Sequence, residues 1–361
     1  MAVQSPTRIP WWAWAWPALS WVMFVLALVL GSAPAVAAAC AAVLIATVFA
    51  AVYHAEVVAH RVGEPFGTLV LAVAVTVIEV GLIVSVMLGG GAETSGLARD
   101  TVFAAVMIVC NGIVGLCLLS GGVRHYEQGF QVQGASAALA VLAALTTLTL
   151  VLPNVTTTAA GPVFSTAQLI FAGAVSLVLY GSFVFVQTIR HRDYFLPVDT
   201  EEGTHAPPPS NATAGISLFL LLASLVSVVG LAKVLTPTLE SGVSRAGAPK
   251  AVVGIVIAAL VLLPEGLAAV RAARANRLQT SLNLALGSAL ASIGLTIPAV
   301  AIVSIALAQP LALGLGLKEE VLLALTLLVG VVTLGTGRTT VLQGIVHLVI
   351  LAAFLFLAVV P

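Results

Sequence analysis

GTLVLAVAVTVIEVGLIVSVML, from Gly67 to Leu88, is an almost wholly apolar stretch with a single carboxylate, Glu79, near its middle. At 1.5 Å per residue such a stretch crosses a bilayer core of about 30 Å, so it predicts a transmembrane helix. Glu79 then lies too far from either interface for its carboxylate to reach bulk water. An ionised carboxylate at that depth costs several kcal/mol unless it meets a proton, a cation or water in a protein-lined cavity.

A second stretch, AVVGIVIAALVLLPEGLAAV (Ala251–Val270), repeats this pattern with Glu265 inside an apolar run. Pro264 precedes the carboxylate and has no backbone N–H, so it frees a carbonyl oxygen nearby. The simplest explanation of two such carboxylates is one shared site for a cation or protons.

The composition places the whole chain in a membrane. It is 60% hydrophobic and 8% charged with a mean hydropathy of +1.16, values that no soluble domain reaches. Its net charge of zero gives no indication of a nucleic-acid partner. Five tryptophans between Trp11 and Trp21 suit an interfacial aromatic belt that leads into an anchoring first span. The expected partners are therefore the lipid bilayer and the ions that cross it.

Apolar runs separated by polar breaks predict an all-α membrane protein. The eleven predicted spans are 11–30, 35–58, 67–89, 101–120, 135–152, 164–188, 213–235, 249–270, 280–308, 320–335 and 340–360.

The loop charges predict the orientation. With eleven spans, nine Lys and Arg residues fall on the side of the N-terminus and five on the opposite side. The positive-inside rule then places the N-terminus in the cytoplasm and the C-terminus outside, for a chain in a cell inner membrane.

One long hydrophilic segment, 190–212, divides the chain. Its Pro run and its acidic residues Asp199, Glu201 and Glu202 favour a mobile cytoplasmic linker. We expect an extra N-terminal helix (1–34), a five-helix repeat with Glu79 (35–189), this linker and a second five-helix repeat with Glu265 (213–361). Because five spans separate the two acidic helices, they cross the membrane in opposite senses, as in the inverted repeats of secondary transporters.

Oxygen atoms near the two carboxylates are the candidate cation ligands. Thr76 lies one turn before Glu79 on the same helix face. Asn111, Ser288 and Ser292 lie on helices that directly follow the acidic ones, and the two serines share a face. Calcium favours several hard oxygen ligands of this kind, although each hydroxyl can instead bond to its own helix.

Other candidates carry less weight. Glu56 and His60 are i, i+4 neighbours at the cytoplasmic end of the second span, where they form a possible proton relay or simply a polar helix end. His347 is the lone histidine of the last span and is expected to be a packing residue. The sequence has no H-E-x-x-H, G-x-S-x-G or P-loop motif, so we expect neither an enzyme nor a bound cofactor.

These stretches resemble the calcium/cation antiporter superfamily, and most closely its bacterial calcium (sodium, potassium)/proton antiporters. Ala55–Ile83 is similar to the first alpha-repeat of the family, Leu260–Val270 with Asn283–Pro298 to the second, and Gly337–Gly344 to its C-terminal signature. The likeness covers about residues 35–360. It implies that Glu79 and Glu265 are the paired cation-binding glutamates and that the acidic linker corresponds to an acidic segment of related exchangers.

The chain departs from the pattern of dedicated calcium/proton exchangers. These have an asparagine three residues before each glutamate, where this chain has Thr76 and Leu262. They also have a glutamine where this chain has Ala291. Fewer amide oxygens at the site leave room for sodium or potassium as the transported cation.

The sequence thus predicts a cation/proton antiporter that exports Ca²⁺, Na⁺ or K⁺ by alternating access. A sodium/calcium-type exchanger without proton coupling is the nearest alternative. A passive cation channel and a membrane enzyme are more distant ones, and the missing nucleophile and metal motifs disfavour the enzyme.

Overall fold

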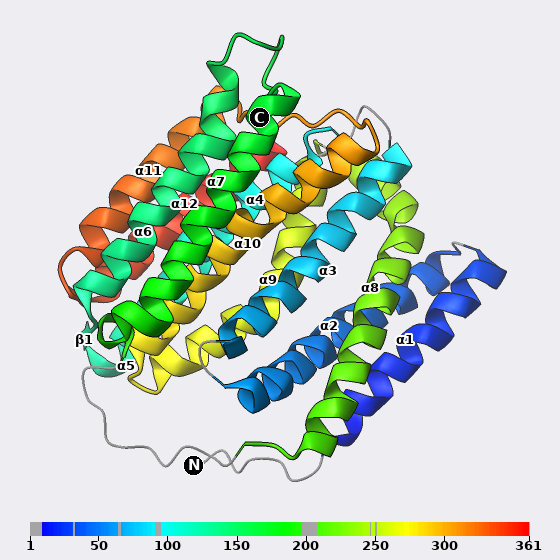
Figure 1. The fold of residues 1–361 in the computed structure, drawn as a ribbon, viewed down its shortest axis with the longest axis horizontal. Helices are drawn as coiled ribbons and strands as arrows, with labels where there is room; N and C mark the ends of the chain where they lie inside the picture. Colours follow the sequence, from blue (N-terminus) through cyan, green and yellow to red (C-terminus); the bar gives the residue numbers. More distant parts are fainter. Residues whose placement is uncertain are drawn as a thin grey trace. The chain divides into compact units, whose positions relative to one another are not determined.

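A computed structural model describes residues 9–31, 33–63, 66–90, 95–196, 208–245, 247–249 and 251–360 (Figure 1). The acidic residues Asp199, Glu201 and Glu202 of the expected linker lie outside the described residues, as do Arg8 and Lys250. Within the described ranges the fold is helical apart from a few residues of β-structure.

The longer helices are α1 (Trp11–Leu30), α2 (Pro34–Val62), α3 (Phe66–Gly90), α4 (Leu97–Met107), α5 (Val114–His125), α6 (Val132–Thr146), α7 (Thr166–Phe185), α8 (Asn211–Arg245), α9 (Ala251–Arg274), α10 (Leu278–Ala306), α11 (Leu317–Leu334) and α12 (Val341–Val359). Shorter π- and 3₁₀-helical pieces are η2 (Ile108–Ile113), η3 (Thr147–Val151), η4 (Leu152–Asn154), η5 (Val186–Arg190) and η6 (Arg192–Phe195). The two strands are β1 (Gln128–Gly129) and β2 (Arg338–Thr339).

The π-helical piece η2 joins α4 and α5 into one continuous helix, which leaves eleven long helices in the described part of the chain. Ten of them are long and apolar enough to cross a membrane. The exception is α11, whose first turn carries Lys318, Glu319 and Glu320. This protein is therefore an all-helical membrane protein, as the sequence predicts.

Several helices extend beyond their predicted bounds, and α8 does so furthest. Helix α8 continues past the predicted end at residue 235 to Arg245, with Pro237 inside it. A single proline removes one backbone hydrogen bond, which a long helix tolerates when its neighbouring turns remain bonded. The polar last turns of α8 extend the helix beyond the length that a bilayer core of about 30 Å requires. Helix α11 begins at Leu317, three residues before the predicted start, and its first turn takes in the charged residues.

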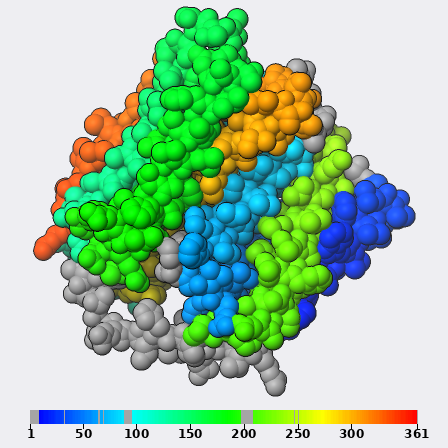
Figure 2. Space-filling view, viewed as in Figure 1, coloured from blue at the N-terminus to red at the C-terminus, as the bar shows by residue number. Residues whose placement is uncertain are grey.

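The chain forms two compact units, and the first comprises Met1–Gly89 and Glu201–Ala246. In this unit α1, α2 and α8 pack against one another. Ser20 of α1 donates a 2.7 Å hydrogen bond to Ser227 of α8. Figure 2 shows α3 and α8 side by side, and the side chain of Val229 in α8 lies against Gly81 of α3.

The second unit comprises Gly90–Thr200 and Gly247–Pro361. Helix α10 packs against α6, α7 and α9, and most of its residues are buried (Figure 1). Helix α9 also packs against α4 and α5, while α12 packs against α5. The helix that carries Glu265 is thus enclosed on several sides by helices of its own unit.

Two antiparallel connections in the second unit reflect the repeat. Strand β1 follows the third helix of the first half and pairs with β2, which precedes the last helix of the second half. The bridge between Val163 and Ala312 is the counterpart of this pairing. Ala312 follows α10, the third helix of the second half, and Val163 precedes α7, the last helix of the first half. The final helix of each half also begins with a capping box, at Ser165 for α7 and at Thr340 for α12. The same antiparallel pairing and the same helix capping therefore recur in both halves.

Candidate functional site

Glu79 lies in the middle of α3 and belongs to the first unit. Its side chain is only 2% exposed. Thr76, one turn earlier, is also buried, and its position three residues before Glu79 places it on the same face of α3. A carboxylate at this position is removed from bulk water and depends on protein groups, a proton or a cation for its stability.

Glu265 lies on α9 in the second unit and is 8% exposed. Pro264, directly before it, sits inside the helix and cannot donate the usual backbone hydrogen bond. Ser288 of α10 donates a hydrogen bond from Oγ to Oε2 of Glu265. The structure thus brings together the carboxylate and one of the hydroxyl groups that the sequence nominated.

Ser292 lies one turn after Ser288 on α10 and is buried. The α9–α10 pair therefore supplies a carboxylate and a row of neutral oxygen atoms within an otherwise apolar core. Such a set of oxygen atoms can bind a hard cation, and protonation of the carboxylate converts it to a neutral acid when no cation is bound.

Asn111 has other neighbours. It is fully buried in η2, where its Nδ2 donates to Oγ1 of Thr326 at 2.9 Å and its Oδ1 lies 3.1 Å from Nδ1 of His347. The Nε2 atom of His347 lies 3.2 Å from Oγ1 of Thr333. Sequence reasoning did not anticipate this network, because Asn111 and His347 are 236 residues apart. The sequence signals were an asparagine and a histidine, each inside an apolar span.

Glu56 and His60 lie on α2 as predicted, and both side chains are exposed. No hydrogen bond or ion pair links them in the described part of the first unit. His54, on the same helix, is buried, and its Nε2 bonds to the carbonyl of Ala13 at 2.9 Å. The proton relay between Glu56 and His60 therefore stays a prediction.

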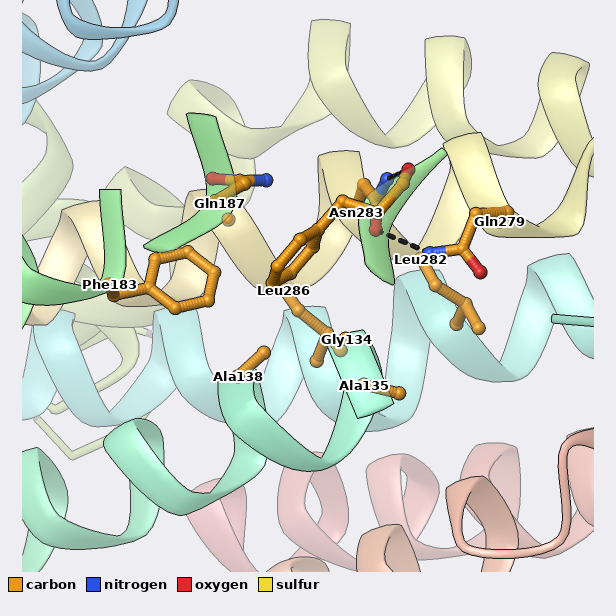
Figure 3. Close-up of a pocket in the computed structure, with 11 residues that line it drawn as sticks. Gly134, Ala135, Ala138, Phe183, Gln187, Gln279, Leu282, Asn283 and Leu286 are labelled. Carbon is orange, nitrogen blue, oxygen red and sulfur yellow. Dashed lines mark hydrogen bonds between the residues drawn. The ribbon is translucent and has the colours of Figure 1, made fainter. Parts of the chain in front are cut away.

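A small cavity lies between α6, α7 with η5, and α10 (Figure 3). Its polar lining consists of the amides of Gln187, Gln279 and Asn283, and Gln279 donates a 2.9 Å hydrogen bond to Asn283. Asn283 in turn donates to the carbonyl of Phe195 in η6. This amide cluster fixes the start of α10, the helix that carries Ser288. The sequence hint was the i, i+4 spacing of Gln279 and Asn283.

The described residues hold no group of three or more His, Cys, Asp and Glu side chains that could bind a metal ion. The candidate cation ligands are thus single carboxylates accompanied by neutral oxygens. Buried carboxylates on apolar spanning helices, in a chain built from two similar five-helix halves, define a class: a multi-pass secondary transporter of ions.

Comparison with known proteins places the chain more narrowly. A model of the sodium/calcium exchanger protein family matches residues 19–189 and 216–360, in two separate stretches. The chain therefore belongs to the sodium/calcium exchanger family, and it is a transporter rather than an enzyme. The two matched stretches correspond to the two halves of the fold.

Two relatives and one solved structure illustrate the similarity. The chain is 53% identical over 362 aligned positions to a putative ionic transporter, y4hA, of Sinorhizobium fredii (strain NBRC 101917 / NGR234), covering 98% of this chain and 97% of the relative. It is 35% identical over 317 positions to the sodium-potassium/proton antiporter ChaA of Escherichia coli (strain K12), covering 86% and 85%. Its fold is similar to that of native YfkE, with a TM-score of 0.74 and 18% identity over 97% of this chain and 100% of the other.

Proposed function

We propose that this protein is a cation/proton antiporter that exchanges Ca²⁺, or Na⁺ and K⁺, for protons. The observation that carries the proposal is the buried carboxylate of Glu265, which accepts a hydrogen bond from Ser288 inside an apolar helix pair. Membership of an exchanger family supports it. The sodium-potassium/proton activity named for the 35% identical relative supports proton coupling.

In this proposal Glu79 and Glu265 form one site and alternate between a cation-bound and a protonated state. A buried carboxylate that is charged and empty is costly, because the low-dielectric interior does not replace its hydration. Release of the cation therefore requires uptake of protons, and this requirement couples the two fluxes. Thr76, Ser288 and Ser292 would contribute neutral oxygen ligands, while Asn111 is a less favoured ligand because its amide already bonds to Thr326 and His347.

We also propose the arrangement of the chain in the bilayer. The halves at 35–189 and 213–361 would be inverted repeats, with the extra helix before them and the 190–212 linker on the cytoplasmic side. The excess of Lys and Arg in the loops of that side supports a cytoplasmic N-terminus and an external C-terminus. The bacterial sources of the relatives support the cytoplasmic membrane as its location.

Sodium/calcium exchange without proton coupling is the second candidate. It is favoured by the match to the sodium/calcium exchanger protein family. The chemistry at the site is the same in both cases, since carboxylates and hydroxyls bind either cation. The two candidates differ only in whether protons are the counter-ion.

Transport in everted membrane vesicles tests the proposal. A proton gradient is established, and Ca²⁺, Na⁺ and K⁺ are added separately while the internal pH is recorded. The proposal predicts that at least one cation collapses the gradient in vesicles with this protein but not in vesicles without it. Ca²⁺ uptake that depends on a sodium gradient and leaves the pH unchanged would support the second candidate. Cation flux that needs no counter-ion gradient would indicate a channel and contradict both.

A further inference from the structure

Four buried polar side chains from three elements of the second unit form a continuous hydrogen-bonded network. They are Asn111 of η2, Thr326 and Thr333 of α11, and His347 of α12, and none is more than 4% exposed. The Glu265–Ser288 pair lies on two other helices, α9 and α10. The network therefore needs an explanation of its own.

The bonds of the network determine where its protons lie. The hydroxyl of Thr326 donates to the carbonyl of Leu322 at 2.7 Å, so its oxygen accepts from Asn111. The amide nitrogen of Asn111 thus faces Thr326, and its amide oxygen faces Nδ1 of His347. Because an amide oxygen can only accept, Nδ1 carries the proton. Nε2 then accepts from the hydroxyl of Thr333, and His347 is neutral with every polar atom bonded.

Asn111 attaches this network to η2, the π-helical piece between α4 and α5. Residues 108–113 are π-helical, which inserts an extra residue into the turn and shifts the face that all later residues present. Ile113, at the end of that turn, lies against Gly266 of α9, where a Cβ atom would be only 3.2 Å from its Cδ1 atom. Gly266 directly follows Glu265, so the π-turn supports the backbone that carries the carboxylate.

We propose that His347 is a positioning residue for the cation site. Its hydrogen bond to Asn111 holds the π-turn of η2 in place. The π-turn positions Ile113 against Gly266, and Gly266 in turn positions the neighbouring Glu265. This inference rests on the proposed function wherever exchange is the readout. The tautomer of His347 does not depend on that function and can be measured separately.

Two substitutions separate the roles of the ring nitrogens. The amide nitrogen of asparagine can occupy the place of Nδ1, and that of glutamine the place of Nε2. His347→Asn therefore retains the donor to Asn111, whereas His347→Gln loses it. We expect His347→Asn to exchange with a half-saturating cation concentration close to that of the original protein, and His347→Gln to need about tenfold more.

His54 provides the matched control. His54 lies in the first unit and contacts the carbonyl of Ala13 through Nε2 rather than Nδ1. Glutamine, whose amide replaces Nε2, should therefore be the better substitute here. We expect His54→Gln to be more thermally stable in detergent than His54→Asn. Ile113→Val removes Cδ1 without introducing a polar group, and it tests the route to Gly266. Its effect on half-saturation should not add to that of His347→Gln, because residues on one route are coupled.

Nitrogen-15 spectra of histidine-labelled protein complete the test. We expect the signals of one neutral imidazole ring with Nδ1 protonated and Nε2 unprotonated, and we expect these signals to be missing from the spectrum of His347→Asn. A His347 ring protonated at Nε2 would overturn the inference, and so would equal half-saturation in the Asn and Gln variants. Additive effects of Ile113→Val and His347→Gln would overturn the route. A protein that shows the expected tautomer but exchanges no cation would instead contradict the proposed function.

Discussion

At the scale of single residues, a carboxylate inside a membrane helix is stable only where other groups replace its hydration. Glu265 has one such group in the Ser288 hydroxyl, held on the neighbouring helix α10. A hydrogen bond to a charged group contributes about 1.5–3 kcal/mol, more than one to a neutral group. Ser288 is therefore expected to contribute to cation binding at Glu265.

Substitution of Ser288 by alanine should raise the cation concentration for half-maximal exchange by about tenfold or more. The variant retains the helix but removes the donor to Glu265. Ser304→Ala is the control on the same helix, since the hydroxyl of Ser304 bonds to the carbonyl of Gln309 instead. Exchange should be measured against cation concentration for both variants at matched protein levels. Equal half-saturation in the two variants would contradict a role for Ser288 at the site.

Much of the chemistry at this scale follows from the sequence. Glu79 and Glu265 are conspicuous because each interrupts an apolar span, and Ser288 because it shares a helix face with Ser292. The network of Asn111 and His347 does not follow, because its partners are far apart in the chain. The sequence suggested Asn111 as a cation ligand and His347 as a packing residue, but not a bond between them. Hydrogen bonds between distant helices require the fold.

At the scale of helices, the close approach of α5 and α12 determines which residues fit between them. Gly344 of α12 lies so near α5 that a Cβ atom would be 2.5 Å from the backbone nitrogen of Leu119. Backbone atoms cannot move aside as a flexible side chain does. Small residues of this kind allow membrane helices to pack closely without a hydrophobic driving force.

Gly344→Ala should lower the melting temperature in detergent by several degrees, because overpacking costs about 1–3 kcal/mol. Gly181→Ala on α7 serves as the control, since a Cβ atom there meets nothing within 4 Å. The control should be as stable as the original protein or more stable, because alanine favours a helix by up to about 1 kcal/mol over glycine. A Gly344→Ala protein as stable as its control would show that α5 and α12 are not held at this distance.

The existence of the helices could be predicted from hydropathy, but their ends could not always. The hydropathy of α8 falls before Pro237, yet its backbone hydrogen bonds continue to Arg245. The charged first turn of α11 looks like a loop in the sequence and is helical in the structure. The π-turn in η2 has no recognisable sequence signature, and η2 packs against helices from distant parts of the chain, among them α10 and α12.

At the scale of the whole molecule, the repeat explains why two acidic helices occur at all. The paired segments at β1–β2 and at Val163–Ala312 connect equivalent parts of the two halves within the second unit. An odd offset of five spans inverts one half relative to the other, a common design of transporters that work by alternating access. The repeat was predictable from the two acidic stretches, whereas the division into units was not.

Cysteine labelling tests the predicted orientation. Ser95→Cys should react with a membrane-impermeant maleimide from outside the cell, and Gly203→Cys only in everted vesicles. Background labelling should be low, because Cys40, Cys110 and Cys117 are all buried. Reaction of both introduced cysteines from the same side would contradict the assigned topology.

The central claim is that Glu79 and Glu265 act together at one site, and three variants test it most directly. Glu79→Gln and Glu265→Gln retain the shape of the side chain and remove the titrating charge. A neutral amide is easier to place in a bilayer than a carboxylate, so all three variants should insert normally.

Proton-coupled cation exchange and membrane protein level should be measured together in Glu79→Gln, Glu265→Gln and the double variant. We predict that each single variant loses coupled exchange and that the double variant is no worse, because residues that act as a unit are not additive. Near-normal proton-coupled exchange in a well-inserted Glu79→Gln protein would contradict the claim.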